Sequence, residues 1–180
     1  LILKNLGFIS PETFEVLVDV NDVKSRMIFQ EDSQKELLER RKRREGPIFE
    51  GDESLIWSDE QYAIEGKFAS DGLEAISLSR LINNKWFLKS NNSRSIVLNS
   101  FDRLQEAYLE YTYNFAKNKY FISPNIQNSN RENPFVDYSF LMLSMYGSHG
   151  LRPHNRKFYF NSFLDKFCLL YTSPSPRDVR

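Results

Sequence analysis

The chain of 180 residues has a single cysteine, Cys168, which excludes a disulfide framework and a thiolate metal site built by this chain alone. It has no excess of one charge either, because 24 Lys and Arg residues balance 24 Asp and Glu residues. A balanced charge gives no overall attraction to nucleic acid or to an anionic membrane surface. No apolar run approaches the length of a membrane span, so we expect no span in this chain.

Both ends of the chain indicate a fragment. Residues 168–178 read CLLYTSPSPRD, and codons for this stretch can spell, at every residue, the adapter left by transposase-based library preparation. We therefore expect residues 168–180 to be a non-native tail, excluded from the fold, and residues 1–167 to be the natural part. A natural Ser/Pro-rich tail is the alternative. The chain begins at Leu1 without a signal peptide, so we expect a piece of a larger protein, open at both ends.

The first part of the sequence predicts a β-hairpin. Residues 13–20 alternate between polar and apolar side chains, as in a half-buried strand, and residues 25–31 read as a second strand. Asn21 and Asp22 between them are typical turn residues.

A helix and a short strand are expected next. Ser33 and Glu36 fit a capping box, in which each side chain accepts from a free amide at a helix start. The helix is predicted to run to the Gly46-Pro47 stop. Residues 47–50 read as a short strand.

Later segments favour helices. Residues 72–82 are predicted as a helix, although Ser and Asn are frequent there. Residues 101–115 place apolar side chains at steps of three and four, with Asn99 or Ser100 as the N-cap. Residues 135–146 predict a very apolar, buried helix.

A last strand is expected at residues 157–160, followed by turn residues. The order is strands first, then helices, then a strand pair that the expected adapter tail cuts off. That order argues for an α+β fold.

The strongest candidate site is the polar loop between the buried helix and this last strand. It contains both histidines of the chain, His149 and His154, together with Asn155 and Lys157. Histidine can transfer protons at neutral pH, Asn can offer a neutral oxygen to a metal ion, and Lys can hold phosphate oxygens. The alternative is a solvated turn whose polar side chains cap the neighbouring elements. A zinc site would lack a third ligand.

A second candidate is the carboxylate pair Glu31 and Asp32 at the end of the second strand. Glu31 could orient a lysine or a metal ion near a bound nucleotide. The alternative is a strand end at which Asp32 and Ser33 interact favourably with the start of the following helix.

The basic run of residues 40–44 could bind phosphate, nucleic acid or a targeting receptor. Glu36, Glu39 and Glu45 flank it at helical spacing, however, which favours a solvated, ion-paired helix face.

Several of these segments together resemble the CotH-like (spore-coat protein H) kinases, in a variant found in large bacterial proteins. The matching segments are Met27-Ile28-Phe29-Gln30-Glu31, residues 37–40, residues 43–53, the helix at 135–146 and the loop and strand at 149–160. The resemblance covers about residues 13–55 and 135–167.

The resemblance implies an atypical protein-kinase-like fold, truncated to small-lobe strands plus the start of a helical large lobe. It implies an ATP- and Mg-dependent phosphotransferase with a protein as the acceptor. Glu31, Asn155 and Lys157 would serve the nucleotide, Asn155 would also be a metal ligand, and His149 or His154 would serve the acceptor.

Two departures from the family pattern leave an alternative open. Ser148 and His149 stand where the family has a catalytic Asp, and the second metal-binding Asp would be expected just after the strand at 157–160, in the part that we expect to be lost to adapter. A non-catalytic kinase-like module that binds a partner or a glycan is therefore the alternative. A nucleic-acid-binding domain that uses residues 40–44 is the least favoured, because the net charge is balanced.

Overall fold

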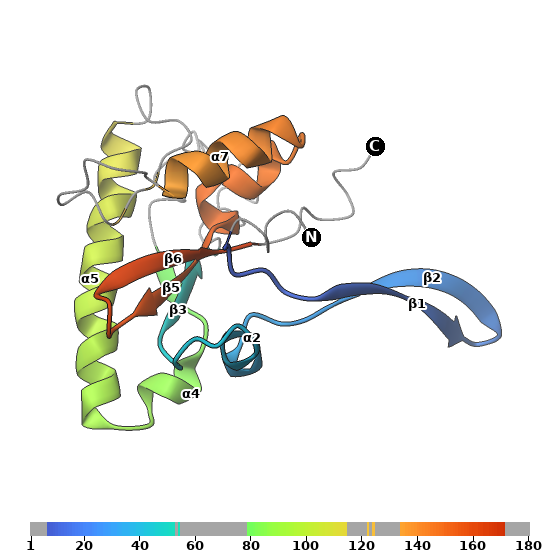
Figure 1. The fold of residues 1–180 in the computed structure, drawn as a ribbon, viewed down its shortest axis with the longest axis horizontal. Helices are drawn as coiled ribbons and strands as arrows, with labels where there is room; N and C mark the ends of the chain where they lie inside the picture. Colours follow the sequence, from blue (N-terminus) through green and yellow to red (C-terminus); the bar gives the residue numbers. More distant parts are fainter. Residues whose placement is uncertain are drawn as a thin grey trace, which may run out of the picture.

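A computed structural model of the chain confirms the α+β class and shows two antiparallel sheets, of which the larger is packed between helices (Figure 1). The described part comprises residues 7–52, 54, 79–114, 122, 124 and 134–171. In these residues no helix is both long and apolar enough to cross a membrane, which agrees with the expectation from the sequence.

The predicted hairpin is confirmed and projects away from the rest of the molecule (Figure 1). Strands β1 (Thr13–Val20) and β2 (Val23–Gln30) pair antiparallel along their whole length. Asn21 and Asp22 join them with φ angles of 52° and 62°. Two consecutive residues with positive φ make the kind of turn whose twist matches that of the strands, and Asn and Asp tolerate it well.

The larger sheet has four antiparallel strands in the order β4-β3-β5-β6. They are β3 (Ile48–Gly51), β4 (Ser79–Leu81), β5 (Lys157–Asn161) and β6 (Lys166–Leu170). The strands predicted at 47–50 and 157–160 are thus confirmed, and they lie side by side although they are far apart in the sequence. The central pair is largely buried because both faces of this sheet are covered.

One face of the sheet packs against α5 (Asn91–Tyr113) and α7 (Pro134–Ser144). Aromatic rings fill this layer. The ring centroids of Phe49 and Phe101 lie 6.3 Å apart, and so do those of Tyr108 and Phe158. Large apolar side chains of this kind supply most of the free energy of burial.

The opposite face is covered by the short helix α2 (Lys35–Arg40), whose Leu37 and Leu38 are fully buried. They pack with Ile48 and Tyr159 in a second, smaller core.

Helix α2 is shorter than predicted, and its predicted capping box is wrong. The N-cap is Gln34 without a side-chain hydrogen bond, because Ser33 is buried and its amide donates to the Asp32 carboxylate at 2.7 Å. The helix ends at Arg40, and Lys42 follows in the left-handed region with φ 54°. A left-handed residue ends a helix, so the basic run does not form a helix face.

Helix α5 begins earlier than predicted. Its N-cap is Ser90, whose hydroxyl accepts from the Ser93 amide at 3.0 Å, so the predicted caps Asn99 and Ser100 are wrong. The Ser100 hydroxyl instead donates to the Ile96 carbonyl at 2.7 Å inside the helix.

Residues 79–81 of the predicted helix at 72–82 are strand β4 instead, and residues 72–78 lie outside the described part. The helix predicted at 135–146 is present as α7, but only one of its sides is buried. Phe135 and Tyr138 lie in the core, whereas Phe140 is 73% exposed.

Strand β6 runs past the boundary at Phe167 that we expected from the sequence. Leu169 and Leu170 are buried, and the Tyr171 amide donates to the Ile9 carbonyl at 2.8 Å. The strand register therefore includes the start of the stretch excluded as adapter. The origin of that stretch stays a prediction about the gene.

Candidate functional site

The loop that carries the predicted site residues forms two short 3-10 helices, η2 (Ser148–Leu151) and η3 (Pro153–Asn155). Buried polar contacts hold this loop in place. The Arg156 Nε donates to the Leu151 carbonyl at 3.0 Å, and the Tyr108 hydroxyl donates to the Pro153 carbonyl at 2.9 Å. The loop is therefore attached to α5 and does not depend on local turn geometry alone.

Helix η3 lies directly against the end of strand β3. A Cβ atom added to Gly51 would be 2.4 Å from both the Pro153 carbonyl oxygen and the His154 Cα. Only glycine allows this approach of two backbone segments, because nothing in the backbone can give way. The structure thus brings His154 and Asn155 to the C-terminal end of β3.

Lys157, the first residue of β5, belongs to an ion-pair cluster that sequence analysis did not find. Its Nζ lies 3.4 Å from Glu50 Oε2, and Arg80 donates to Glu50 Oε1 from Nε at 3.0 Å and from Nη2 at 2.7 Å. Glu50 faces Arg80 on one neighbouring strand and Lys157 on the other in the sheet register. We call these three residues the Glu50 cluster.

The Glu50 cluster carries more positive than negative charge, since two cations share one carboxylate. The Glu50 side chain is 12% exposed, and that of Lys157 is 25% exposed. Partly buried charges interact more strongly than fully hydrated ones. Lys157 and Arg80 are therefore both paired with Glu50, and the charge of Arg80 also acts on Asp52.

Asp52 follows the cluster along the chain. Its carboxylate accepts from the Ser54 amide at 3.0 Å and the Ser54 hydroxyl at 2.7 Å. These hydrogen bonds, together with the charge of Arg80, lower the pKa of Asp52 despite partial burial. Asp52 is therefore ionised at neutral pH.

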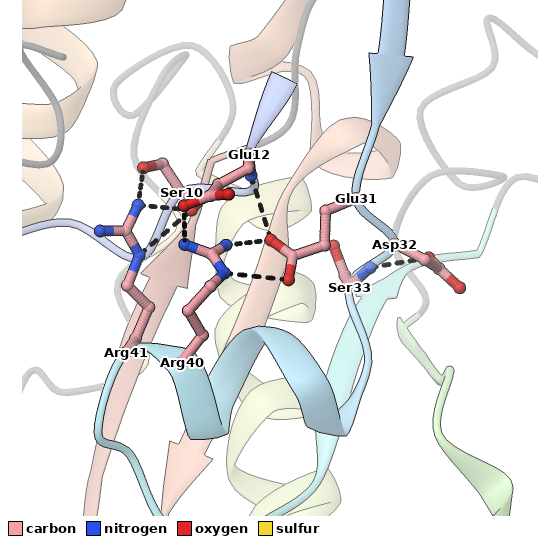
Figure 2. Close-up of polar contacts among 7 residues, drawn as sticks. All are labelled: Ser10, Glu12, Glu31, Asp32, Ser33, Arg40 and Arg41. Atoms are coloured by element: carbon pink, nitrogen blue, oxygen red, sulfur yellow. Dashed lines mark hydrogen bonds and ion pairs between the residues drawn. The ribbon is translucent and has the colours of Figure 1, made fainter. Parts of the chain in front are cut away.

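Glu31 lies in a different cluster, at the base of the hairpin. Its carboxylate accepts from Arg40 Nε at 3.2 Å and from the Glu12 amide at 3.0 Å, and it forms an ion pair with Arg40 Nη2 (Figure 2). Arg40 Nη1 also donates to Glu12 Oε1 at 2.8 Å. We call Glu12, Glu31 and Arg40 the Glu31 cluster.

Burial raises the pKa of Glu31, but the hydrogen bonds from Arg40 and from the Glu12 amide, with the charges of Arg40 and Arg41, lower it overall. The carboxylate is thus ionised at neutral pH and already bound to a cation. Glu31 thus joins the hairpin to α2, and these hydrogen bonds and this ion pair connect it to Glu12 and Arg40 rather than to the Glu50 cluster. Its role beside a nucleotide stays a prediction.

The basic run of residues 40–44 is partly used in such contacts. Arg41 donates to the Ser10 carbonyl from Nη2 at 2.7 Å, beside Arg40 in the Glu31 cluster (Figure 2). The expected flanking partners bind elsewhere: Glu39 pairs with Lys35 at 3.1 Å, and Glu45 accepts from Lys89 at 2.6 Å.

Within the described part of the chain, no three His, Cys, Asp or Glu side chains gather in a way that could hold a metal ion. Near Asn155, the Glu50 carboxylate is bound by two cations and Asp52 accepts from Ser54. These residues do not make a protein-only site for Mg²⁺, so Asn155 as a metal ligand stays a prediction. The side chain of His149 lies outside the described part.

Glu50, Arg80 and Asp52 were not predicted as site residues from the sequence, and only Glu50 gave a weak signal there. Glu50 is a charged residue inside a short apolar strand, and a buried charge requires a partner. Its partners could not be named from the sequence because they come from two other strands.

Searches against protein-family models, curated proteins and solved structures found no match to this chain. The resemblance to CotH-like kinases therefore rests on the sequence motifs alone.

Proposed function

We propose that this chain is part of a CotH-like, ATP- and Mg-dependent phosphotransferase whose phosphate-binding group is Lys157. The observation that supports this proposal is the Lys157–Glu50 ion pair beside η3. Phosphoryl transfer depends mainly on cations and donors held at fixed positions around the phosphates. A lysine held by a glutamate on the neighbouring strand meets that requirement.

The other residues have complementary roles in this proposal. Arg80 supplies a second cation beside Glu50, so that this carboxylate is shared between two cations and Lys157 can also contact phosphate oxygens. Asn155 would contribute one neutral oxygen to Mg²⁺ brought by the nucleotide, and His149 or His154 would accept the proton of the acceptor hydroxyl as that oxygen attacks the γ-phosphate and ADP leaves. Glu31 is proposed to support the nucleotide-binding strand from the hairpin side.

Phosphate transfer from ATP to a protein acceptor tests these roles. Asn155→Ala should abolish metal-dependent transfer, and His154→Ala should slow it by about 100-fold or more, the usual contribution of a general base. Transfer that is unchanged in Asn155→Ala would remove that residue from the site. Equal rates in wild type and His154→Ala would leave His149 as the base to test.

A second candidate is a non-catalytic kinase-like module that binds a partner. It is favoured by the exposed apolar side chains of the β1–β2 hairpin, among them Phe14, Met27 and Phe29. A thermal shift assay separates the two functions. Stabilisation by ATP with Mg²⁺ supports the enzyme, and its absence supports the binding module.

A further inference from the structure

The β1–β2 hairpin has one face that is almost entirely apolar and open to solvent. Because side chains alternate along a strand and paired residues share a face, the register assigns this face unambiguously. We call it the hairpin apolar face: Phe14, Val16, Val18, Val20, Val23, Ser25, Met27 and Phe29. Its five most exposed members are between 48% and 67% exposed. Ser25 is its one polar member.

The opposite face of the hairpin carries the charges. Glu15, Asp19, Lys24 and Arg26 lie there, and Glu15 pairs with Arg26 at 3.1 Å. Leu17 and Ile28 lie among these charges and are 70% and 72% exposed. The opposite face is thus mixed, whereas the hairpin apolar face has no charged side chain. An exposed apolar face that is bordered by charges is the usual mark of a docking surface.

The apolar face also has a gradient in size. At its base the rings of Phe14 and Phe29 lie together, with centroids 5.0 Å apart. At its tip the paired residues are Val20 and Val23. The side chains of this face are therefore large at the end near α2, which we call the thick end, and small at the turn, which we call the thin end.

We propose that the hairpin apolar face docks onto the same face of a second copy of this chain, with the two hairpins antiparallel. A two-fold axis through the middle of the ribbon places the thick end of each face over the thin end of the other. The facing pairs are then Phe14 over Val20, Val16 over Val18, Met27 over Ser25 and Phe29 over Val23. Each larger side chain meets a smaller one or an equal one, which fills the roughly 10 Å layer between stacked sheets.

Charge disfavours edge-to-edge pairing of two hairpins in two registers. Antiparallel pairing of two β1 edges centred on Leu17 would bring Glu15 against Asp19, and pairing of two β2 edges centred on Ser25 would bring Lys24 against Arg26. Like charges directly opposite each other destabilise a strand pair. The apolar face itself has no charge with which to select a charged partner, and a two-fold contact requires only that it complement itself.

The size of the face predicts a weak dimer. From the exposed fractions, each copy would bury roughly 500 Å² if a fully exposed large side chain contributes roughly 200 Å². The total of about 1,000 Å² is at the lower end of specific interfaces. The Glu31 cluster holds the hairpin base on α2, so that little ordering is needed before association.

Sedimentation equilibrium of the full chain from about 10 µM to about 1 mM tests the proposal, since a weak dimer dissociates in this range. Met27→Glu and Ser25→Lys should each weaken dimerisation by at least about tenfold, because each places a charge in the dry layer. An equimolar mixture of the two variants should associate again, because Glu at position 27 then faces Lys at position 25 of the other copy. Ile28→Lys, on the charged face, is the matched control and should leave the dimer unchanged.

A chain that stays monomeric over this whole range would overturn the proposal. It would also be overturned by a dimer that Met27→Glu and Ile28→Lys weaken equally, or by a mixture that associates no better than its components. All three positions are exposed or half-exposed, so the variants should unfold at the wild-type temperature.

Discussion

Asn83, between strand β4 and helix α4 (Asn84–Phe87), holds the segment that enters strand β3, and its loss should destabilise the whole fold. Its side-chain oxygen accepts from the Ile48 amide at 2.8 Å, and its side-chain nitrogen donates to the Gly46 carbonyl at 2.8 Å. The residue is 6% exposed, so water cannot easily replace either bond. Asn83→Ala therefore leaves a buried donor and a buried acceptor without their partner.

Each buried polar group left unsatisfied costs about 1–3 kcal/mol, so the two together should lower the free energy of unfolding by about 2–6 kcal/mol. For a chain of this size that corresponds to a fall of about 5–15 °C in Tm. Thermal and urea unfolding followed by circular dichroism measure both quantities. Asn84→Ala, in the exposed neighbour, is the matched control and should change the free energy of unfolding by less than about 1 kcal/mol. If Asn83→Ala unfolds at the same temperature as Asn84→Ala, the assigned amide bridge is wrong.

Three further changes test other parts of the fold. The folded-state pKa of Glu31 lies below its usual 4.5, so the stability that its carboxylate contributes is present above pH 4.5 and is lost as the pH falls through the lowered value. Glu31→Gln should therefore flatten the acid side of a plot of unfolding free energy against pH. An unchanged acid side would contradict the ion pair with Arg40. Ser90→Ala should lower the free energy of unfolding by about 1 kcal/mol, whereas Ser90→Asp should not, if Ser90 is the cap of α5. Gly51→Ala should lower the free energy of unfolding in urea by about 1–3 kcal/mol because the added methyl group meets the backbone of η3. An unchanged free energy of unfolding would show that η3 lies elsewhere.

The elements that could be predicted from the sequence are those determined by local chemistry. The hairpin was predictable because its alternating strands flank Asn21-Asp22, a pair that tolerates positive φ. Strand β5 was predictable from its apolar run after a polar loop. The amphipathic centre of α5 gave the expected spacing of three and four.

The elements that were missed depend on tertiary contacts. The first turns of α5 contain many Ser and Asn residues, which have low helix propensity, and burial of Val97 against the sheet layer outweighs that preference. The early end of α2 at Arg40 places Arg41 on the Ser10 carbonyl, a contact between distant residues. The second half of β6 was missed because the residues after Phe167 were excluded from the fold.

In the candidate site too, residues that are close in sequence could be predicted, and contacts between distant strands could not. His154, Asn155 and Lys157 are neighbours in sequence, so their proximity was predictable. The Glu50 cluster is not, since its members come from three strands that only the sheet register brings together. Glu31 illustrates the converse: its strand-end position was predicted, but its carboxylate points to Arg40 on the following helix.

Titration calorimetry of ATP with Mg²⁺ into the full chain tests the proposed phosphotransferase most directly. Wild type should bind, and Lys157→Ala should weaken binding at least about tenfold because a charged hydrogen bond to phosphate contributes about 1.5–3 kcal/mol. Lys166→Ala, an exposed lysine on strand β6 of the same sheet, should bind like wild type. No heat of binding in wild type, or equal affinities for the two lysine variants, would contradict phosphate binding at Lys157.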